Sequence, residues 1–469
     1  MKRLFIRILR FKIGLLAKLT IWRFKPFIIA ITGSAGKTSA KEAIFAVLKN
    51  YKRVRRSWGN FNSDLGVPLT ILGDFNEKDL NLFSRNMPAG ANKFKKLTFL
   101  LKVILSAFIR VIGLRSPSQI FQRKTWEGKS AYRYPEILVL EYGADKPGDI
   151  QELIKIAKPD IGIITAIGQI PVHVEFYPSV EAVVREKANL ISDLFTSDLV
   201  VINGDDPWLE NLEKRTRARV KTFGTSSDCD IKISHFGHLT ESGKIKGITF
   251  KLEKEGKSVP VDIADVFSIS HAYASACAAV VAEHFDINLV SVADDISKYY
   301  RPVSGRSVIL DGKKNIQIID ESYNSSPLAL KTALETLKMV SGRRKVAVLG
   351  DMTELGQFTQ KAHEMIGEII SECVGPVRNR EGSQRASVSN GVDVLITVGE
   401  KAKIISDRAV RSGFSKSNTF FFDSITDSSG INIDTIEKIK EILQEGDLIL
   451  VKGSHSVGLE KVVEKIKKL

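Results

Sequence analysis

A short glycine-rich loop is the segment of this sequence that most clearly carries chemistry. Its residues are Gly33, Ser34, Ala35, Gly36, Lys37 and Thr38. The loop follows an apolar run and precedes a segment whose apolar residues recur at helical spacing. Small residues let backbone N–H groups close around phosphate oxygens, the Lys37 ammonium adds positive charge, and the Thr38 hydroxyl can bind Mg²⁺. The loop therefore predicts a site for a nucleoside triphosphate and Mg²⁺.

The match to the commonest phosphate-binding loop is partial. The spacing GxxxxGK[ST] requires its first glycine at position 31, where this sequence has Ile31. A chance occurrence of GxxGKT between two elements is the alternative to a phosphate site.

A second set of polar residues lies in the last third of the chain. Asp320 and Asn324 come at and just after the apolar run 316–320. Ligands of open α/β sheets bind at the carboxyl ends of the strands. These two side chains are therefore candidates for a binding site on a second sheet.

Short β-branched runs that alternate with amphipathic helical patterns are the elements that must position these residues. In the first part of the chain, runs typical of buried parallel strands occupy 27–32, 137–143, 161–167 and 199–204. After Tyr300 the alternation restarts, with runs at 316–320, 345–350, 392–399, 419–423 and 447–453. This pattern predicts an α/β protein with a P-loop-type central domain, whose sheet is mostly parallel, and a Rossmann-like C-terminal domain.

The predicted boundaries are a basic arm at 1–26, a central domain at 27–302 and a C-terminal domain at 303–469, with a hinge near RPVSGR. Lysine-rich sequence near 230–262 indicates a strand-rich edge, and 375–391 is typical of a mobile surface loop. An atypical insertion spans about 79–135.

Composition limits the class of protein. A chain of 469 residues with 43% hydrophobic residues can bury two or three cores. Its three cysteines lie far apart, which argues against a disulfide framework or a zinc ribbon. We find neither a 20-residue apolar run nor a secretory signal, so the expected location is the cytoplasm. The net charge of +15 favours polyanionic partners.

Several further segments, in chain order, resemble motifs of the Mur ligase family, in particular those of its D-alanyl-D-alanine-adding members. The glycine loop resembles that family's TGTxGKT. The other segments are NFNSDLGVPLTIL (60–72), LEYGADKPGDI (140–150), AIGQIPVHVEFYPSVEAVVREKANLI (166–191), VINGDDP (201–207), DESYNSSPLALKTALETL (320–337), VLGDMTELG (348–356) and VKGSHSVGLEKVV (451–463). The resemblance runs from about residue 27 to the end of the chain.

The resemblance implies ATP and Mg²⁺ as cofactors and assigns a set of metal ligands. They are Thr38, Glu141, His173 and Lys187, the last of these carbamylated as in many family members. The alternatives to a metal-binding role are that Glu141 caps a turn, that His173 has no function and that Lys187 is a solvated helix lysine.

The resemblance also implies roles in catalysis and substrate binding. Lys37 and Arg306 would stabilise the γ-phosphate, with Lys187 as the third catalytic residue, and Asp320 and Asn324 would fix the nucleotide. Residues near the two substrates would be Asn60, Asn62, Asp351, Glu354 and Lys452.

Two departures from the family pattern concern recognition. The phosphate loop arrives by residue 33, which leaves no room for the family's usual N-terminal uridine-binding domain. The asparagines expected beside the nucleotide base after His271 are replaced by Ala272 and Ser275.

The implied reaction is phosphorylation of a carboxylate by ATP, followed by attack of an amine on the acyl phosphate. The leading hypothesis is addition of D-alanyl-D-alanine to the peptide of a nucleotide-linked peptidoglycan precursor. A divergent ligase acting on another carboxylate is the second hypothesis. The third is a P-loop protein that binds ATP and a polyanion without catalysis, although no specific nucleic-acid-binding motif is found.

Two segments predict peripheral contact with an anionic membrane at its inner face. Residues 1–26 contain eight Lys and Arg and no acid. Read as a helix, this segment places Arg3, Arg7, Arg10 and Lys18 near one face and Leu4, Ile8, Leu15 and Leu16 on another, with Lys12 interrupting. In 97–114, the polar residues Thr98, Lys102, Ser106 and Arg110 form one narrow stripe. The alternative is that the two helices pack on each other.

Overall fold

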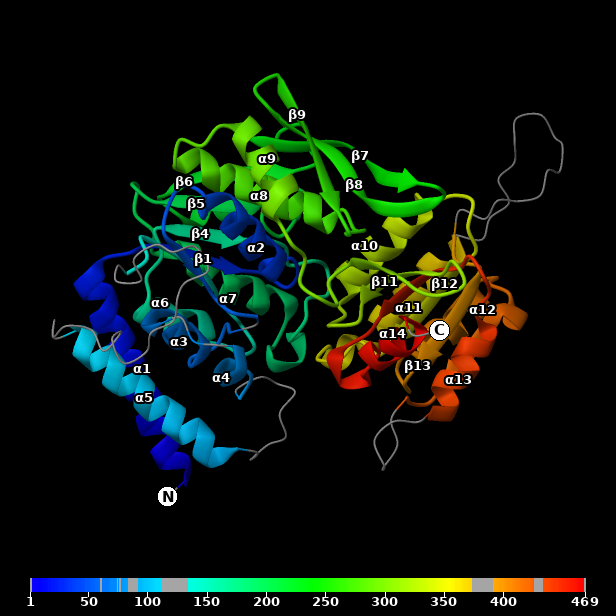
Figure 1. Cartoon of the computed structure of the whole chain (residues 1–469), viewed down its shortest axis with the longest axis horizontal. Coiled ribbons are helices and arrows are strands. Elements are labelled where there is room, and N and C mark those ends of the chain that lie inside the picture. The colour runs from blue at the N-terminus through cyan, green and yellow to red at the C-terminus, as the bar shows by residue number, and fades with distance from the viewer. Residues whose placement is uncertain are drawn as a thin grey trace.

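The fold, obtained as a computed structural model, contains two α/β halves (Figure 1). The structure describes residues 2–59, 61–73, 75, 77–82, 92–111, 134–372, 391–425 and 433–467. Most of the predicted insertion at 79–135 and, except for Gly391, the predicted loop at 375–391 therefore lie outside the described residues.

The first sheet has nine strands in the order β2-β3-β1-β4-β5-β6-β7-β8-β9. Strands β1 to β6 pair in parallel, β6 pairs with β7 in parallel, and β7, β8 and β9 are antiparallel. The strands are β1 (Phe27–Thr32), β2 (Val54–Arg56), β3 (Ile137–Glu141), β4 (Ile161–Ile164), β5 (Leu199–Asn203), β6 (Arg219–Gly224), β7 (Ile231–Glu241), β8 (Lys244–Lys254) and β9 (Lys257–Ala264). The predicted parallel core and strand-rich edge are both present.

Strand β1 lies inside this sheet because apolar side chains cover both of its faces. Ile29 and Ile31 pack into one hydrophobic core, while Ile28 and Ala30 pack into a second core on the opposite face. The first core is completed by α2 (Lys37–Leu48), α8 (Ser270–His284) and α9 (Leu289–Tyr299). The second is completed by α1 (Lys2–Phe24), α3 (Gly66–Leu72), α5 (Lys93–Val111), α6 (Asp149–Ile156) and α7 (Val180–Ser192).

The second sheet has six strands in the order β10-β11-β15-β12-β13-β14, with only β10 antiparallel to its neighbour. Its strands are β10 (Val308–Asp311), β11 (Gln317–Glu321), β12 (Lys345–Gly350), β13 (Val394–Val398), β14 (Thr419–Phe422) and β15 (Leu448–Lys452). Helices α10 (Pro327–Lys338), α11 (Thr359–Glu372) and α12 (Lys403–Arg411) pack on one face, and α13 (Ile433–Ile442) and α14 (Glu460–Lys467) pack on the other. The predicted α/β class is confirmed in both halves.

The two sheets lie on either side of the predicted boundary at 302 and 303, which itself stays a prediction. Short 3-10 helices occur at Val174–Phe176, Leu212–Arg215, Gly356–Phe358, Lys416–Asn418 and His455–Val457, and α4 spans Glu77–Asn81.

Helices α1 and α5 contact each other on the outside of the first half (Figure 1). This confirms the alternative in which they pack together. The predicted apolar face of α1 divides, however, because Leu16 is buried whereas Ile8 and Leu15 are exposed. No described helix is both long and apolar enough to cross a membrane.

Candidate active site

The glycine loop joins β1 to α2 and is shaped by its two glycines. Gly36 has φ 83° and precedes the first turn of α2. A Cβ on Gly33 would collide with the Thr165 hydroxyl, so only glycine fits there. The Ser34 N–H donates to the Ala166 carbonyl at 2.6 Å, which ties the loop to the segment just after β4. The loop is thus held against the neighbouring strand and its small residues face a cleft.

Two lysine side chains converge on one carbonyl of this loop. Lys37 Nζ donates to the Gly33 carbonyl oxygen at 2.6 Å, and Lys187 Nζ donates to the same oxygen at 3.3 Å. Lys187 is on α7 and is 1% exposed, so the alternative that it is a solvated helix lysine is wrong. Burial, reinforced by the charge of Lys37, lowers the pKa of Lys187 to about 7.

Glu141 ends β3 and lies beside the first turn of α2. Its Oε2 accepts a hydrogen bond from the Thr38 hydroxyl at 3.0 Å, and its Oε1 accepts one from Asn62 Nδ2 at 3.4 Å. Glu141 is 2% exposed. Burial alone would raise its pKa, but the charges of Lys41 and Lys37 outweigh burial and hold it below the usual range. The site therefore offers an ionised carboxylate and a hydroxyl side by side.

Lys41 is a residue of this site that sequence analysis missed. Its side chain is fully buried, its Nζ lies 3.6 Å from Glu141 Oε2, and it donates to the Gly59 carbonyl at 2.6 Å. Lys41 lies three residues after Thr38 on α2, a spacing that places both on one helix face. That spacing is the signal that could have found it.

His173 lies between the two halves of the molecule. Its Nε2 is 3.3 Å from Asp145 Oδ1, and its Nδ1 is 2.7 Å from Glu354 Oε2. Both His173 and Glu354 have positive φ angles, 67° and 64°. The structure therefore pairs a predicted metal ligand with a predicted substrate residue.

The predicted metal ligands form a mixed set of donors. Within the described residues, no three His, Cys, Asp or Glu side chains converge as a metal site. Thr38 and Glu141 instead present a hydroxyl and a carboxylate oxygen, which suit Mg²⁺, an ion that takes few protein ligands and fills its shell with phosphate and water. The residues present fit that ion.

The C-terminal half contributes Arg306, Asn324 and Asp320. Arg306 stacks on Tyr323, with its guanidinium carbon 4.5 Å from the ring centroid. Its Nε is buried and, like the Ser34 hydroxyl, has no hydrogen-bond partner in the described part of the chain. The Arg306 Nε and the Ser34 hydroxyl could both donate hydrogen bonds to an anionic ligand. Asp320 points back into its own strand end, where it accepts bonds from the Ser322 N–H and hydroxyl at 3.1 and 2.6 Å.

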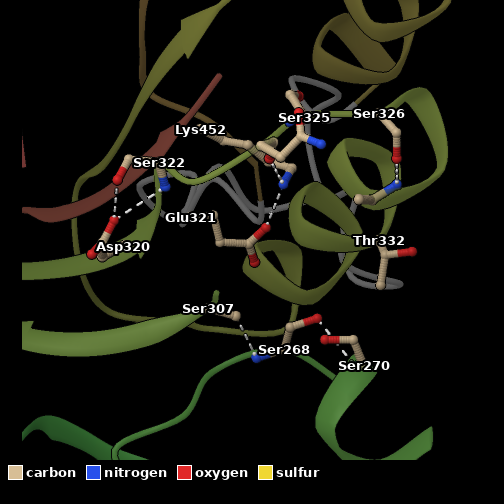
Figure 2. A network of polar contacts seen from close by, with 12 residues as sticks. Ser268, Ser270, Ser307, Asp320, Glu321, Ser322, Ser325, Ser326, Thr332 and Lys452 are labelled. Atoms are coloured by element: carbon tan, nitrogen blue, oxygen red, sulfur yellow. Dashed lines mark hydrogen bonds and ion pairs between the residues drawn. The ribbon is translucent and has the colours of Figure 1, made fainter. Parts of the chain in front are cut away.

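Lys452 and Glu321 form a buried ion pair at the ends of β15 and β11 (Figure 2). Lys452 Nζ lies 2.8 Å from Glu321 Oε2, with side chains 4% and 8% exposed, and also donates to the Asn324 carbonyl at 3.1 Å. The predicted substrate residue Lys452 is therefore held by its own domain.

The remaining predicted substrate residues are dispersed. Asp351 Oδ1 accepts a hydrogen bond from the Ala402 N–H at 2.7 Å and so organises the start of α12. Asn62 lies next to Glu141, as described above. Asn60 lies outside the described residues.

A cleft of 650 Å³ separates the two halves. Six predicted site residues line it, namely Ser34, Ala35, Gly36, Arg306, Asn324 and Lys452. Residues that sequence analysis had not assigned a role also line it, among them Gln169, Asp205, Asp206, Trp208, Tyr273 and Lys331. Asp205 and Asp206 belong to the VINGDDP motif, and that motif could have identified them as site residues from the sequence.

One end of the cleft lies where base-contacting asparagines were expected. Ala272 is fully buried and the Ser275 hydroxyl donates to the His271 carbonyl at 2.8 Å, so neither faces the cleft. Tyr273 does face it, and its hydroxyl donates to Asp205 Oδ2 at 2.7 Å.

Comparison with known proteins shows that both halves of the chain match domains of one protein family. Residues 123–279 match the Mur ligase middle domain, and residues 305–455 match the glutamate ligase domain of Mur ligases. The chain is 27% identical to the UDP-N-acetylmuramoyl-tripeptide–D-alanyl-D-alanine ligase of Bacillus subtilis, over 96% of this chain and 78% of that protein.

Solved structures agree with this in fold. MurF from Acinetobacter baumannii matches with a TM-score of 0.70 at 18% identity, covering 98% of this chain and 80% of that one. The MurF ligase of Thermotoga maritima in complex with ADP matches with a TM-score of 0.69 at 22% identity, covering 98% and 83%.

Proposed function

Because the chain belongs to the Mur ligase family, we propose that it is an ATP-dependent, ADP-forming ligase that makes a C–N bond. The bond joins D-alanyl-D-alanine to the peptide carboxylate of a nucleotide-linked peptidoglycan precursor, the reaction named for its relatives. The observation that carries the proposal is the convergence of Lys37 and Lys187 on Gly33, beside the Thr38–Glu141 pair.

The first step transfers the γ-phosphoryl group of ATP to the acceptor carboxylate. Two anions must approach each other, so positive charge that is already in place lowers the barrier most. Lys37 lies in the loop itself, and Arg306 lines the opposite wall of the cleft with its Nε unpaired. In the second step the amine of D-alanyl-D-alanine attacks the acyl phosphate, forming the amide and releasing phosphate and a proton.

Mg²⁺ would be held by Thr38 and Glu141, where it supplies charge compensation between the phosphates. We infer that Lys187 completes the ligand set as a carbamate, formed when its neutral amine attacks CO₂ and loses a proton. A pKa of about 7 supports this, since it leaves a large share of the amine uncharged at neutral pH. An unmodified ammonium would repel the metal.

The C-terminal half would fix the nucleotide and the incoming amine. Asn324 lines the cleft and fits the nucleotide role. Asp320 and Lys452 would position this end of the sheet without touching the nucleotide themselves. Asp320 accepts a hydrogen bond from Ser322, and Lys452 pairs with Glu321 and donates to the Asn324 carbonyl. We infer that Asn62, which donates to Glu141, lies on the side of the cleft that binds the acceptor. We also infer that His173 and Glu354 lie where the two halves meet.

A ligase that uses another carboxylate acceptor is the second candidate. Tyr273 and Asp205 line the cleft at the end where base-contacting asparagines were expected. This divergence from the family pattern concerns nucleotide binding and does not select an acceptor. A P-loop protein that binds ATP and a polyanion without catalysis is disfavoured, because the buried Thr38–Glu141 pair and Lys187 are more than binding requires.

We further infer that the chain acts in the cytoplasm at the inner face of the membrane, through peripheral contact. The proposed substrates support the cytoplasmic location, because ATP and nucleotide-linked precursors are cytoplasmic compounds.

The test is product identification by mass spectrometry. Purified protein is incubated with ATP, Mg²⁺, D-alanyl-D-alanine and the nucleotide-tripeptide, and separately with a panel of other carboxylates. Formation of a nucleotide-pentapeptide together with ADP is the expected result. Phosphate release that depends only on another acceptor would establish the second candidate, and the absence of ADP with every acceptor would contradict the ligase proposal.

A further inference from the structure

Helices α1 and α5 each carry apolar side chains on two opposite faces. The inner faces are buried in the second core of the first half, through Leu9, Ile13, Leu16 and Ala17 on α1 and Phe99, Leu100, Val103 and Ala107 on α5. These faces account for the packing of both helices onto the protein. The outer faces need a separate explanation.

The outer face of each helix carries a stripe of exposed apolar side chains. Its members recur three, four or seven residues apart, which places them on one side of a helix. They are Ile8, Phe11, Leu15, Leu19 and Trp22 on α1 and Phe94, Leu101, Leu105 and Phe108 on α5. Phe11 and Trp22 are each 71% exposed and Phe94 is 83% exposed, so the largest side chains are also among the most open. We call these nine residues the outer stripes.

The outer stripes concentrate the exposed apolar surface of the molecule. Of fifteen exposed large hydrophobic side chains among the described residues, ten lie on α1 and α5, counting Phe24. The other five lie far apart in the chain, on other helices or in connecting segments, and are Tyr51, Phe176, Phe195, Val290 and Met339. Scattered apolar residues are ordinary on a protein surface, but a concentrated set marks a binding surface.

The charges beside the stripes are positive. Lys12 and Lys18 on α1 and Lys95 and Lys102 on α5 are exposed. Neither helix contains an acidic residue in its sequence. Arg10 on α1 is paired with the carboxylate of Asp64 at 2.9 Å. A surface with aromatic and aliphatic side chains at its centre and lysines at its margin complements the interface of an anionic bilayer.

We propose that the outer stripes of α1 and α5 form a peripheral docking surface for an anionic lipid membrane. The side chains of Phe11, Trp22 and Phe108 would enter the acyl boundary, while the flanking lysines would contact lipid phosphates. Neither helix is apolar enough to span, so each would lie in the plane of the interface. This assignment does not rest on the ligase proposal.

The position of the surface leaves the catalytic cleft open. The two helices lie on the outside of the first half, away from the second half (Figure 1). None of the residues that line the cleft belongs to α1 or α5. Membrane binding through the outer stripes is therefore compatible with entry of ATP and D-alanyl-D-alanine.

The experiment is co-sedimentation of the full chain with vesicles of phosphatidylglycerol and phosphatidylcholine, compared with vesicles of phosphatidylcholine alone. The test variant is Phe11→Gln/Leu15→Gln/Trp22→Gln, with Leu101→Gln/Leu105→Gln/Phe108→Gln as a second one. The matched control is Phe195→Gln/Val290→Gln/Met339→Gln, which removes three exposed apolar side chains elsewhere. Circular dichroism, the unfolding temperature and ligase turnover without vesicles show whether each variant retains its fold.

The intact chain and the control are expected to pellet with the anionic vesicles and to be released by salt. Each stripe variant should bind roughly tenfold or more weakly, because three apolar side chains no longer leave water. Lys12→Gln/Lys18→Gln should lower binding to anionic vesicles roughly fivefold per lysine and leave binding to neutral vesicles unchanged.

Three outcomes would overturn the inference. Negligible pelleting of the intact chain with both vesicle types would do so, as would equal binding by the stripe variants and the control. A concentration-dependent dimer that the stripe variants abolish, without vesicle binding by the intact chain, would assign the surface to a second copy of this chain. Ligase turnover is measured in the same preparations, so failure of docking and failure of catalysis are distinguished.

Discussion

The Thr38 hydroxyl donates a hydrogen bond of 3.0 Å to Glu141 Oε2, although the two residues are 103 positions apart in the chain. This contact joins the first turn of α2 to the end of β3 at the point where both elements meet the phosphate loop. The positive charges of Lys41 and Lys37 hold the pKa of this carboxyl below its usual range, so it is available to a cation without prior loss of a proton.

Glu141→Gln is expected to raise the Mg²⁺ concentration for half-maximal activity by roughly tenfold or more, because a neutral amide is a weaker ligand for a hard cation. Magnesium titration of ATP-dependent ligation measures this. Glu136→Gln removes a 43% exposed carboxylate just before the same strand and serves as the control. An unchanged Mg²⁺ requirement in Glu141→Gln would remove Glu141 from the metal site.

Lys37→Ala is expected to lower kcat by roughly a hundredfold or more while the unfolding temperature stays close to that of the intact protein. Removal of one preorganised charge from a transferring phosphoryl group costs about 3 kcal/mol in the transition state. Lys52→Ala, an exposed lysine beyond the same helix, should be fully active. Near-normal turnover in Lys37→Ala would contradict the phosphate-loop assignment.

Lys187→Ala is expected to lose activity that a short carboxylic acid partly restores, because the added carboxylate replaces the carbamate. Lys155→Ala, an exposed lysine on α6, should lose no activity and respond to no additive. Full activity of Lys187→Ala without an additive would exclude the role.

Activity that depends on the Lys187 carbamate should fall as pH decreases through about 7 and should also fall when CO₂ is removed. Burial lowers the pKa of this lysine to about 7, so its neutral, reactive form predominates above that pH and is lost below it. An ordinary lysine would be neutral in roughly one molecule in 3,000 at pH 7. The measurement is the pH profile of turnover with and without bicarbonate, and carbon-13 labelling detects the carbamate directly.

Lys452→Met and Glu321→Gln are each expected to destabilise the protein by about 3 kcal/mol, since either change leaves one buried charge or polar group without its partner. The double variant should recover part of this loss. Urea unfolding of the four proteins in a double-mutant cycle gives the coupling energy. Strictly additive losses would show that the pair does not act as a unit.

Local sequence was sufficient for the strand, loop and helix that build the nucleotide site. Runs of β-branched residues, a glycine-rich loop and helical apolar spacing are all visible in neighbouring residues of the sequence, so 27–48 could be assigned without a fold. Motif order likewise indicated two α/β halves, and Glu141, Arg306 and Asn324 were found at strand or loop ends as expected. The sequence by itself thus determined the class of fold and the glycine loop between β1 and α2, and it named the residues that we propose for catalysis.

Only the tertiary structure decided which distant groups meet. Lys187 contacts Gly33 from 154 positions away, and Lys41 becomes fully buried against Glu141, because α7 and α2 approach the same strand ends. Burial is a property of what packs against a side chain, and this explains the correction on α1. Periodicity assigned Ile8, Leu15 and Leu16 to one apolar face, whereas packing onto α3 and α5 buries Leu16 and leaves Ile8 and Leu15 open. A helix with two apolar faces looks uniform in sequence, and only the neighbouring elements select which face enters the core.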